Sequence, residues 1–185
     1  MRYKRTIVLN DGRECVLRNA TADDGKAVLE NFILTHAQTD ELLTYPDEIT
    51  VTAEQESEFL QRRADSDDET ELIALVGNAV AGSAGIGRVG SKYKLRHRAS
   101  FGISIDKEYW GLGIGRALTE GCIECARKAG YTQLELDVAA DNERALTLYR
   151  SVGFTEYGRN PLGFRSRISG WQELVLMRLV LKETQ

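Results

Sequence analysis

Three glycines within a span of five residues constrain this chain more than any other feature. Residues 108–117 read Glu-Tyr-Trp-Gly-Leu-Gly-Ile-Gly-Arg-Ala, and an alternating apolar run, Phe101–Ile105, lies shortly before them. After the glycines, apolar residues recur three or four positions apart, as on one face of a helix, at Ile114, Leu118, Cys122, Cys125 and Ala129. The sequence therefore predicts a strand, a glycine turn and a helix in succession.

Such a turn is suited to bind a phosphate group. Glycine has no Cβ to keep an anion away, and the first free amides of a helix point at whatever lies at its N-terminus. Two common phosphate motifs fit poorly, because Arg116 and Ala117 stand where a P-loop needs Lys and Ser or Thr, and Arg116 also stands where a dinucleotide motif needs its last glycine. The ligand stays open, and so does the simpler interpretation that the turn only connects strand to helix.

Length and composition indicate a single domain over residues 1–185. A chain of 185 residues with 42% hydrophobic and 28% charged residues is ordinary for a globular protein with one substantial core. The charged segment Met1–Leu9 lacks the apolar stretch of a signal peptide, and no later stretch is long and apolar enough to span a membrane. We therefore expect a cytoplasmic protein with no membrane partner.

The cysteines and histidines do not suggest a metal site. Three cysteines, an odd number, argue against a disulfide framework. Cys122 and Cys125 form a C-x-x-C pair, but they lie in the middle of the predicted helix, and the two histidines, His36 and His97, are remote in sequence. We expect buried, unreactive thiols and no metal.

Charge is distributed unevenly along the chain. The formal net charge of −4 argues against nucleic acid as the main partner. Asp40–Glu71 holds twelve acidic residues against two arginines, whereas Arg88–Arg98 holds five arginine or lysine residues and no acidic one. These segments are either two solvated faces, or the acidic one attracts a cationic substrate.

The remaining patterns predict alternating strands and helices. Strands are expected near residues 14–18, 72–76, 79–89, 99–105, 134–138, 154–157 and 171–181. Helices are expected after a cap at Thr21–Asp24, over 52–64, from the glycine turn to Gly130, and from a cap at Asp141 to Gly153. Loops are expected around Pro46 and over 159–170, which includes Pro161. This order predicts an α/β (α+β) domain with a mixed sheet.

Two motifs together resemble a known family. The glycine turn is followed by Asn142-x-x-Ala145-x-x-x-Tyr149-x-x-x-Gly153-Phe154, and with the order of elements this resembles the GNAT superfamily of acyl-CoA-dependent N-acetyltransferases. The resemblance is strongest from about residue 100 to 157. It implies a mixed, mostly antiparallel central sheet of six to seven strands flanked by about four helices, an acetyl-CoA-binding core at about 99–157, and a possible homodimer.

The resemblance also implies the residues that bind acetyl-CoA. The family loop reads Gln/Arg-x-x-Gly-x-Gly/Ala, which Gly113 and Gly115 match and Trp110 does not. The backbone amides of the turn would bind the pyrophosphate, and Ile103 and Ile105 would pair with the pantetheine arm through their backbone. The backbone amides that would bind the pyrophosphate are those of Gly111, Leu112, Gly113, Ile114, Gly115 and Arg116.

Acetyl transfer needs a neutral amine, a polarised thioester carbonyl and a protonated leaving thiolate. A backbone amide near Ile103–Ile105 would stabilise the oxyanion. In the family, a tyrosine at the position of Tyr149 lies near the thioester sulfur, where a phenol acts as general acid, and a residue at the position of Asn142 contacts the cofactor. Alternatively, Tyr149 is a core aromatic whose hydroxyl the backbone satisfies, and Asn142 only opens a helix.

The general base and the acceptor stay open. Four residues lie in or near the strands that should flank the site, and none is singled out as the base: Glu71, Ser104, Glu108 and Asp137. The resemblance places Thr39–Ile49 and the 159–170 loop near the acceptor, which is a small-molecule or peptide primary amine. A cationic amine would suit the acids of the first segment, with Tyr45 as a cover: Asp40, Glu41, Asp47 and Glu48.

We therefore expect a cytoplasmic N-acetyltransferase that transfers the acetyl group directly in a ternary complex, since no cysteine is placed as an acyl carrier. The first alternative is a non-catalytic acyl-CoA-binding sensor or structural module. The second is an enzyme whose glycine turn holds ATP or a dinucleotide, which the missing motif residues disfavour.

Overall fold

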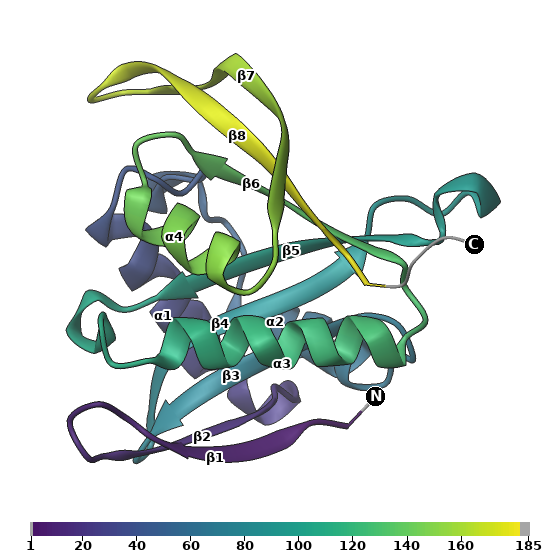
Figure 1. The fold of residues 1–185 in the computed structure, drawn as a ribbon. Helices are drawn as coiled ribbons and strands as arrows, with labels where there is room; N and C mark the ends of the chain where they lie inside the picture. Colours follow the sequence, from purple (N-terminus) through teal and green to yellow (C-terminus); the bar gives the residue numbers. More distant parts are fainter. Residues whose placement is uncertain (1, 182–185) are drawn as a thin grey trace.

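The computed structural model describes residues 2–181, in which eight strands form one sheet and four α-helices pack around it (Figure 1). The strands are β1 (Lys4–Val8), β2 (Glu14–Asn19), β3 (Thr70–Val76), β4 (Ala79–Arg88), β5 (Arg98–Ile105), β6 (Gln133–Ala139), β7 (Thr155–Ser166) and β8 (Gly170–Val180). The helices are α1 (Gly25–Gln38), α2 (Ala53–Ala64), α3 (Ile114–Lys128) and α4 (Glu143–Ser151).

The sheet is mixed and mostly antiparallel, as predicted. Its order is β1-β2-β3-β4-β5-β6-β8-β7, and every neighbouring pair is antiparallel except β5 and β6. The strand count is higher than the six to seven expected. No helix within residues 2–181 has both the length and the apolar character needed to cross a membrane.

The additional strand, β1, lies at the N-terminal edge of the sheet. It pairs with β2 from Lys4 against Arg18 to Val8 against Glu14. Its side chains are mostly exposed and only Ile7 is partly buried. The side chains of this edge strand do not alternate between buried and exposed, so the sequence pattern identifies only a charged segment and not a strand.

The expected loop over 159–170 is wrong, because β7 continues to Ser166 and forms a hairpin with β8. The pairing shifts register between Asn160 and Phe164, and Pro161 lies in that irregularity. Proline is tolerated in a sheet at such a bulge because it has no amide to donate. Pro46 opens a short 3-10 helix rather than lying in an open loop.

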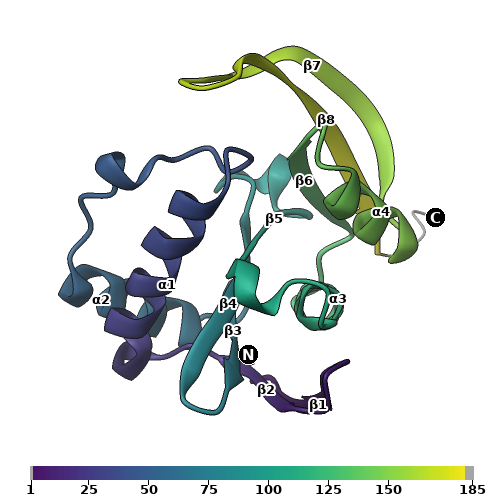
Figure 2. The ribbon, with the colours of Figure 1, turned by 90° about the vertical axis from the view of Figure 1, so that its left-hand side faces the viewer.

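Helices cover both faces of the sheet, with α1 and α2 on one side and α3 and α4 on the other (Figure 2). The larger core lies under α3 and includes Leu72, Ile86 and Leu118. Under α1 and α2 the buried apolar cluster has only four members: Ala20, Val28, Leu60 and Ile73. Phe32 and Ile33, which the pattern places on the apolar face of α1, stay more than a third exposed. This face of the sheet is therefore incompletely filled.

The start of α4 differs from prediction by one residue. Asn142, and not Asp141, is the N-cap, and its Oδ1 accepts a hydrogen bond from the Ala145 amide at 3.0 Å. The other predicted helix boundaries hold: Thr52 caps α2, while Gly130 and Gly153 follow α3 and α4 with positive φ.

The strands β5 and β6 diverge in the middle of the sheet. They pair only from Arg98–Ser100 to Gln133–Glu135. Beyond that point β5 stays paired with β4 up to Ile105, and β6 stays paired with β8 up to Ala139. The two strands spread apart beyond this point, and the N-termini of α3 and α4 lie beside their diverging ends (Figure 1).

Candidate functional site

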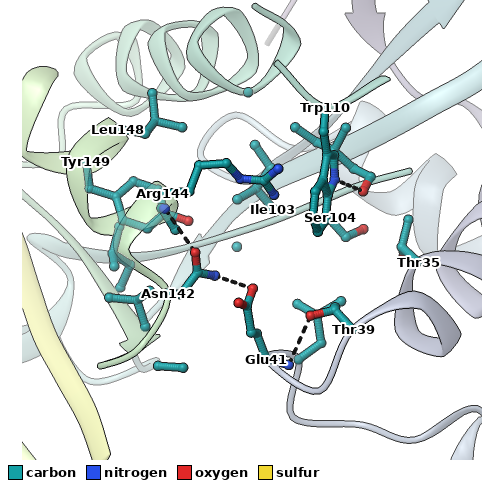
Figure 3. Close-up of a pocket in the computed structure, with 18 of the residues that line it drawn as sticks. Thr35, Thr39, Glu41, Ile103, Ser104, Trp110, Asn142, Arg144, Leu148 and Tyr149 are labelled. Carbon is teal, nitrogen blue, oxygen red and sulfur yellow. Dashed lines mark hydrogen bonds between the residues drawn. The ribbon is translucent and has the colours of Figure 1, made fainter. Parts of the chain in front are cut away.

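A cavity of about 430 Å³ occupies the cleft between β5 and β6. The glycine turn, the first turns of α3 and α4, and the segment after α1 complete its wall (Figure 3). Most residues predicted to bind a cofactor line it: Ile103, Ile105, Gly111, Gly113, Gly115, Arg116, Asn142 and Tyr149. Leu112 and Ile114 do not, and the Ile114 side chain is fully buried in the core.

The backbone of β5 presents hydrogen-bonding groups to this cleft. The carbonyl of His97 accepts amides from the β6 side, and the carbonyl of Arg98 accepts one from the β4 side. Successive peptide groups of a strand face opposite sides, so Ile103 and Ile105 present their amides and carbonyls to the cleft. The Ile105 carbonyl accepts the indole N–H of Trp110 at 2.8 Å. The amide and carbonyl of Ile103 stay open, since among residues 2–181 no strand pairs with the cleft side of β5 there.

The glycine turn forms the end wall of the cavity. Gly111 and Gly113 have φ of 77° and 99°, and Gly113 is the N-cap of α3. A Cβ at either position would meet no other atom within 4 Å, so backbone conformation and not crowding requires glycine there. Asn10, in the β1–β2 turn, braces the loop through its side chain to the Gly111 carbonyl at 2.9 Å. The free amides of α3 therefore face open space beside a fixed turn.

Trp110, the departure from the family loop, has a defined role in this site. The guanidinium carbon of Arg144, on α4, lies 3.4 Å from the centroid of its ring. The indole thus holds a cation in the cavity wall and caps the β5 carbonyl of Ile105 (Figure 3). Sequence reasoning misses Arg144, because no spacing rule links it to Trp110.

Asn142 joins the two sides of the cavity mouth. Its Nδ2 donates a hydrogen bond to Oε2 of Glu41, which lies in the segment after α1 (Figure 3). The same side chain caps α4 through its Oδ1. Asn142 therefore opens a helix and also lines the cavity, so the two interpretations of this residue are compatible.

Tyr149 lies on the cavity side of α4 with 7% of its surface exposed. Its ring packs against Phe101 and Phe154, with centroids 6.1 and 5.9 Å away. Its hydroxyl makes no hydrogen bond to any residue from 2 to 181, so the backbone does not satisfy it. Burial, and to a lesser extent the charge of Glu41, raises the pKa of Tyr149 to about 12. The phenol therefore keeps its proton at neutral pH.

The acidic segment after α1 is mostly engaged with the β7–β8 hairpin. Asp47 and Glu48 pair with Arg167 at 2.8 and 3.4 Å, and Asp40 accepts a hydrogen bond from Ser169 at 2.8 Å. These contacts confirm that residues 39–49 and 159–170 lie together. They also correct the expected role of Asp40, Asp47 and Glu48, which hold the hairpin. Glu41 is the one acid of that set that lines the cavity.

A second cavity, of about 930 Å³, lies between α1, α2 and the sheet. It shares Leu42 and Gly102–Ser104 with the first cavity, so the two meet at the end of β5. Its floor consists of small residues: Ser83, Gly85, Gly87, Ser100, Gly102 and Ser104. Among the four candidate bases, Glu71 lines this cavity, Ser104 lines both cavities, Asp137 lines only the first, and Glu108 lines neither.

The cysteines are buried, as predicted, and none lines either cavity. Burial raises the pKa of the Cys125 thiol to about 11 and that of Cys122 well above its usual value. Over residues 2–181, no three His, Cys, Asp or Glu side chains are grouped so as to hold a metal ion.

Several known proteins are similar to this chain in sequence and in fold. The sequence profile described as the Acetyltransferase (GNAT) family matches residues 35–154. The chain is 42% identical over 102 residues to the N-alpha-acetyltransferase RimI of Mycobacterium tuberculosis, covering 55% of this chain and 61% of that one. It is 29% identical over 142 residues to the L-amino acid N-acetyltransferase AaaT of Escherichia coli, covering 76% and 83%.

Solved structures agree with this match. The crystal structure of an acetyltransferase of the GNAT family from Streptococcus pneumoniae has a TM-score of 0.81 and 28% identity, covering 90% of this chain and 99% of that one. The sequence match to the mycobacterial relative spans less than two thirds of that relative's length.

Proposed function

Because the chain belongs to the acetyltransferase (GNAT) family, we propose that it transfers an acetyl group from acetyl-CoA to a primary amine, directly and within a ternary complex. The observation that carries this proposal is the meeting of two cavities at Gly102–Ser104. The first cavity, between β5 and β6, has the open strand edge and the helix N-terminus that suit a CoA thioester. The second cavity, between α1, α2 and the sheet, reaches Gly102–Ser104 from the other side of β5.

Residues 99–157 supply the binding site for acetyl-CoA in this proposal. The open carbonyl of Ile103 accepts a hydrogen bond from an amide of the pantetheine arm, which leaves the Ile103 amide free. The amides from Gly111 to Arg116 and the N-terminus of α3 hold the pyrophosphate. Arg144, stacked on Trp110, adds a positive charge beside the position where the family loop has Gln or Arg. The empty space beside Gly111 and Gly113 supports the fit.

Acetyl-CoA supplies an activated acyl group, and the chain supplies the hydrogen bonds and protons. The Ile103 amide donates to the oxygen that becomes negative as the amine attacks. A carbon–nitrogen bond forms, the carbon–sulfur bond breaks, and Tyr149 gives its proton to the departing thiolate. The nitrogen that attacks as a neutral amine loses one proton as it becomes the amide, and that proton restores the Tyr149 hydroxyl. A buried phenol with a pKa of about 12 is protonated when the reaction begins. Direct transfer is supported by the absence of any cysteine from the walls of both cavities.

A thermal-shift experiment tests the cofactor, and a thiol-release assay tests the transfer. Acetyl-CoA and CoA at about 100 times their Kd should each stabilise the protein by about 2.7 kcal/mol, whereas ATP and NAD should not. Release of CoA in the presence of a panel of primary amines should then identify an acceptor. A shift with CoA ligands but no turnover with any amine would instead favour a non-catalytic acyl-CoA sensor.

The relatives leave the acceptor undecided. One is named an N-alpha-acetyltransferase and the other an L-amino acid N-acetyltransferase. We therefore take a primary amine as the acceptor class here.

A further inference from the structure

The second cavity contains a carboxylate aimed along a row of glycines. Glu71 on β3 pairs with Gly85 on β4, and Gly85 pairs with Gly102 on β5. Directly paired residues point to the same face of a sheet, and the two glycines leave that row empty. The Glu71 side chain lies across Gly85, because a Cβ there would be 2.1 Å from its Oε2. Its carboxylate therefore points toward Gly102, where the two cavities meet.

A guanidinium lies over the neighbouring position of the same strand. Arg63, on α2, is fixed by hydrogen bonds from its Nη1 to the carbonyls of Thr70 and Ile86. A Cβ at Gly87 would be 3.1 Å from its Nη2. Gly87 is two residues from Gly85, which corresponds to about 7 Å along a strand. The cavity floor thus presents one negative and one positive group side by side.

These two groups are not paired with each other. No ion pair joins Arg63 to any carboxylate in residues 2–181, and its Nε is buried without a hydrogen-bond partner. Its Nη2 makes no hydrogen bond to the described residues either. The Glu69 carboxylate lies beside the same position, with its Oε1 3.3 Å from where a Cβ of Gly87 would be, and it accepts the Arg88 amide. The guanidinium therefore has donors available for an anion.

Apolar side chains line part of the walls around this pair. They include Phe32 on α1, Phe59 on α2, and Val51 just before α2. The other titratable groups facing Glu71 are Glu56 and His36, besides Arg62 and Glu58 at the exposed rim. Burial lowers the pKa of His36, so this imidazole is neutral at pH 7.

We propose that the acceptor is a free α-amino acid with an apolar side chain, whose ammonium binds Glu71 and whose carboxylate binds Arg63. This inference rests on the proposed function. The ammonium and carboxylate of an α-amino acid are about one hydrogen-bond length apart, so with one hydrogen bond of about 2.9 Å at each end the molecule reaches up to about 9 Å. That reach covers the spacing of about 7 Å between Gly85 and Gly87, over which the two protein groups lie. The apolar side chain lies against Phe32 and Phe59.

The same geometry gives Glu71 a chemical step. The acceptor ammonium transfers one proton to the Glu71 carboxylate, and the lone pair this leaves on nitrogen faces Gly102 and Ile103, where the thioester carbonyl is placed. The protonated carboxyl then returns its proton to water between turnovers.

Kinetics with matched acceptors test the inference. We would measure kcat/KM for L-phenylalanine, its amide and the dipeptide phenylalanylglycine, all of which offer the same α-amine. The loss of one partner of a desolvated charge pair costs at least 2 kcal/mol, or about 30-fold. L-phenylalanine should therefore exceed the amide and the dipeptide by about 30-fold or more.

Substitutions then assign the preference to a residue. Arg63→Gln should bring the ratio of acid to amide close to one while the amide is still acetylated. A ratio does not depend on how much protein is folded. Arg62→Gln, which removes an exposed arginine next in sequence, should keep the preference. Equal rates for acid and amide in the wild-type protein, or a preference that follows Arg62, would overturn the inference.

The failures of the two proposals can be told apart. If acetyl-CoA binds and polyamines or peptides are acetylated while L-phenylalanine and L-leucine are not, only the acceptor inference fails. If acetyl-CoA produces no thermal shift and no amine is acetylated, the proposed function fails and the inference with it.

Discussion

The Tyr149 hydroxyl lies among aromatic rings without a hydrogen-bond partner in residues 2–181, and its pKa of about 12 keeps it protonated. Tyr149→Phe removes the proton and retains the ring. Because general acid catalysis typically contributes 100-fold or more, kcat should fall by about 100- to 1,000-fold. Affinity for acetyl-CoA, measured by calorimetry, should change little. An unchanged kcat in the thiol-release assay would remove Tyr149 from the reaction.

Glu71 gives the reaction a pH dependence with a definite sign. Burial raises the pKa of its carboxyl to about 7, although Arg63 and Ser83 act in the opposite direction. Below that pH the carboxyl is protonated and cannot accept a proton from the amine. We therefore expect kcat/KM to rise between about pH 6 and pH 8, and Glu71→Gln to abolish the rise together with most of the activity.

A carboxyl in the same cavity provides the control for this profile. Glu56 is half-buried on α2, and burial also raises its pKa. Glu56→Gln should keep the rise near pH 7. A profile that loses its rise in this variant, and keeps it in Glu71→Gln, would contradict the role of Glu71.

The same shift makes stability depend on pH. The pKa of Glu71 is higher in the folded chain than in the unfolded one, so its contribution to the free energy of unfolding is fully present below about pH 4.5 and is lost as pH rises through about 7. Between about pH 5 and pH 8, wild type should lose up to roughly 3 kcal/mol relative to Glu71→Gln, at 1.36 kcal/mol per pKa unit. Urea unfolding of both proteins at the two pH values measures this difference, and parallel curves would contradict it.

Among the secondary-structure elements, the sequence predicts those that depend on local patterns. The strand, glycine turn and helix from Phe101 to Lys128 follow from alternation, glycine spacing and helical periodicity, and all three are confirmed. The strands at 154–157 and 171–181 are also confirmed, but the continuation of β7 to Ser166 is not predicted, because its exposed side chains and the irregularity at Pro161 hide the alternation. Arg144 escapes prediction as well, since its place over Trp110 results from the divergence of β5 and β6.

The glycine turn makes a prediction at this scale. Gly113→Ala forces a side chain into φ of 99°, which should destabilise the protein by about 1 kcal/mol and displace the first amides of α3. We expect acetyl-CoA affinity to fall by about tenfold, as for the loss of one charge-assisted hydrogen bond.

A glycine outside the site separates strain from binding. Gly130, which follows the C-terminal end of α3, has φ of 84° and open space around its Cβ position. Gly130→Ala should therefore lower Tm about as much as Gly113→Ala does and keep full acetyl-CoA affinity. Equal losses of affinity in both variants would mean that stability alone, and not the geometry of the turn, sets binding.

At the scale of the whole molecule, the site depends on contacts between distant segments. The family, the mixed sheet and most residues that line the first cavity could be predicted, because they follow from the order of elements and from motifs within residues 100–157. The acceptor side could not, since its cavity is formed by helices and strands whose register places Arg63 beside Glu71 only after folding. The acidic segment illustrates this difference, because its charge is evident from sequence and its partner Arg167, 120 residues away from Asp47, is not.

That long-range contact should control access of the acceptor. The Tyr45 hydroxyl accepts the Arg167 amide at 2.8 Å and donates to Asp40 at 3.1 Å, which holds the β7–β8 hairpin to residues 39–49. This segment also carries Leu42, which both cavities share. Tyr45→Phe removes both hydrogen bonds and keeps the ring under Arg167. We expect faster hydrogen exchange in residues 159–170 and an acceptor KM raised several-fold, to about tenfold.

Acetyl-CoA affinity should change little in Tyr45→Phe, because the open edge of β5 and the turn before α3 do not depend on this hydroxyl. Tyr157→Phe is the matched control: Tyr157 lies on the same hairpin, is exposed, and its hydroxyl makes no hydrogen bond to residues 2–181. It should leave exchange and both substrate constants unchanged. If Tyr45→Phe weakens acetyl-CoA binding and leaves the acceptor KM unchanged, the hairpin contact supports the cofactor cleft instead. Tyr45→Phe thus tests whether the contact between the β7–β8 hairpin and residues 39–49 supports binding of the acceptor or binding of acetyl-CoA.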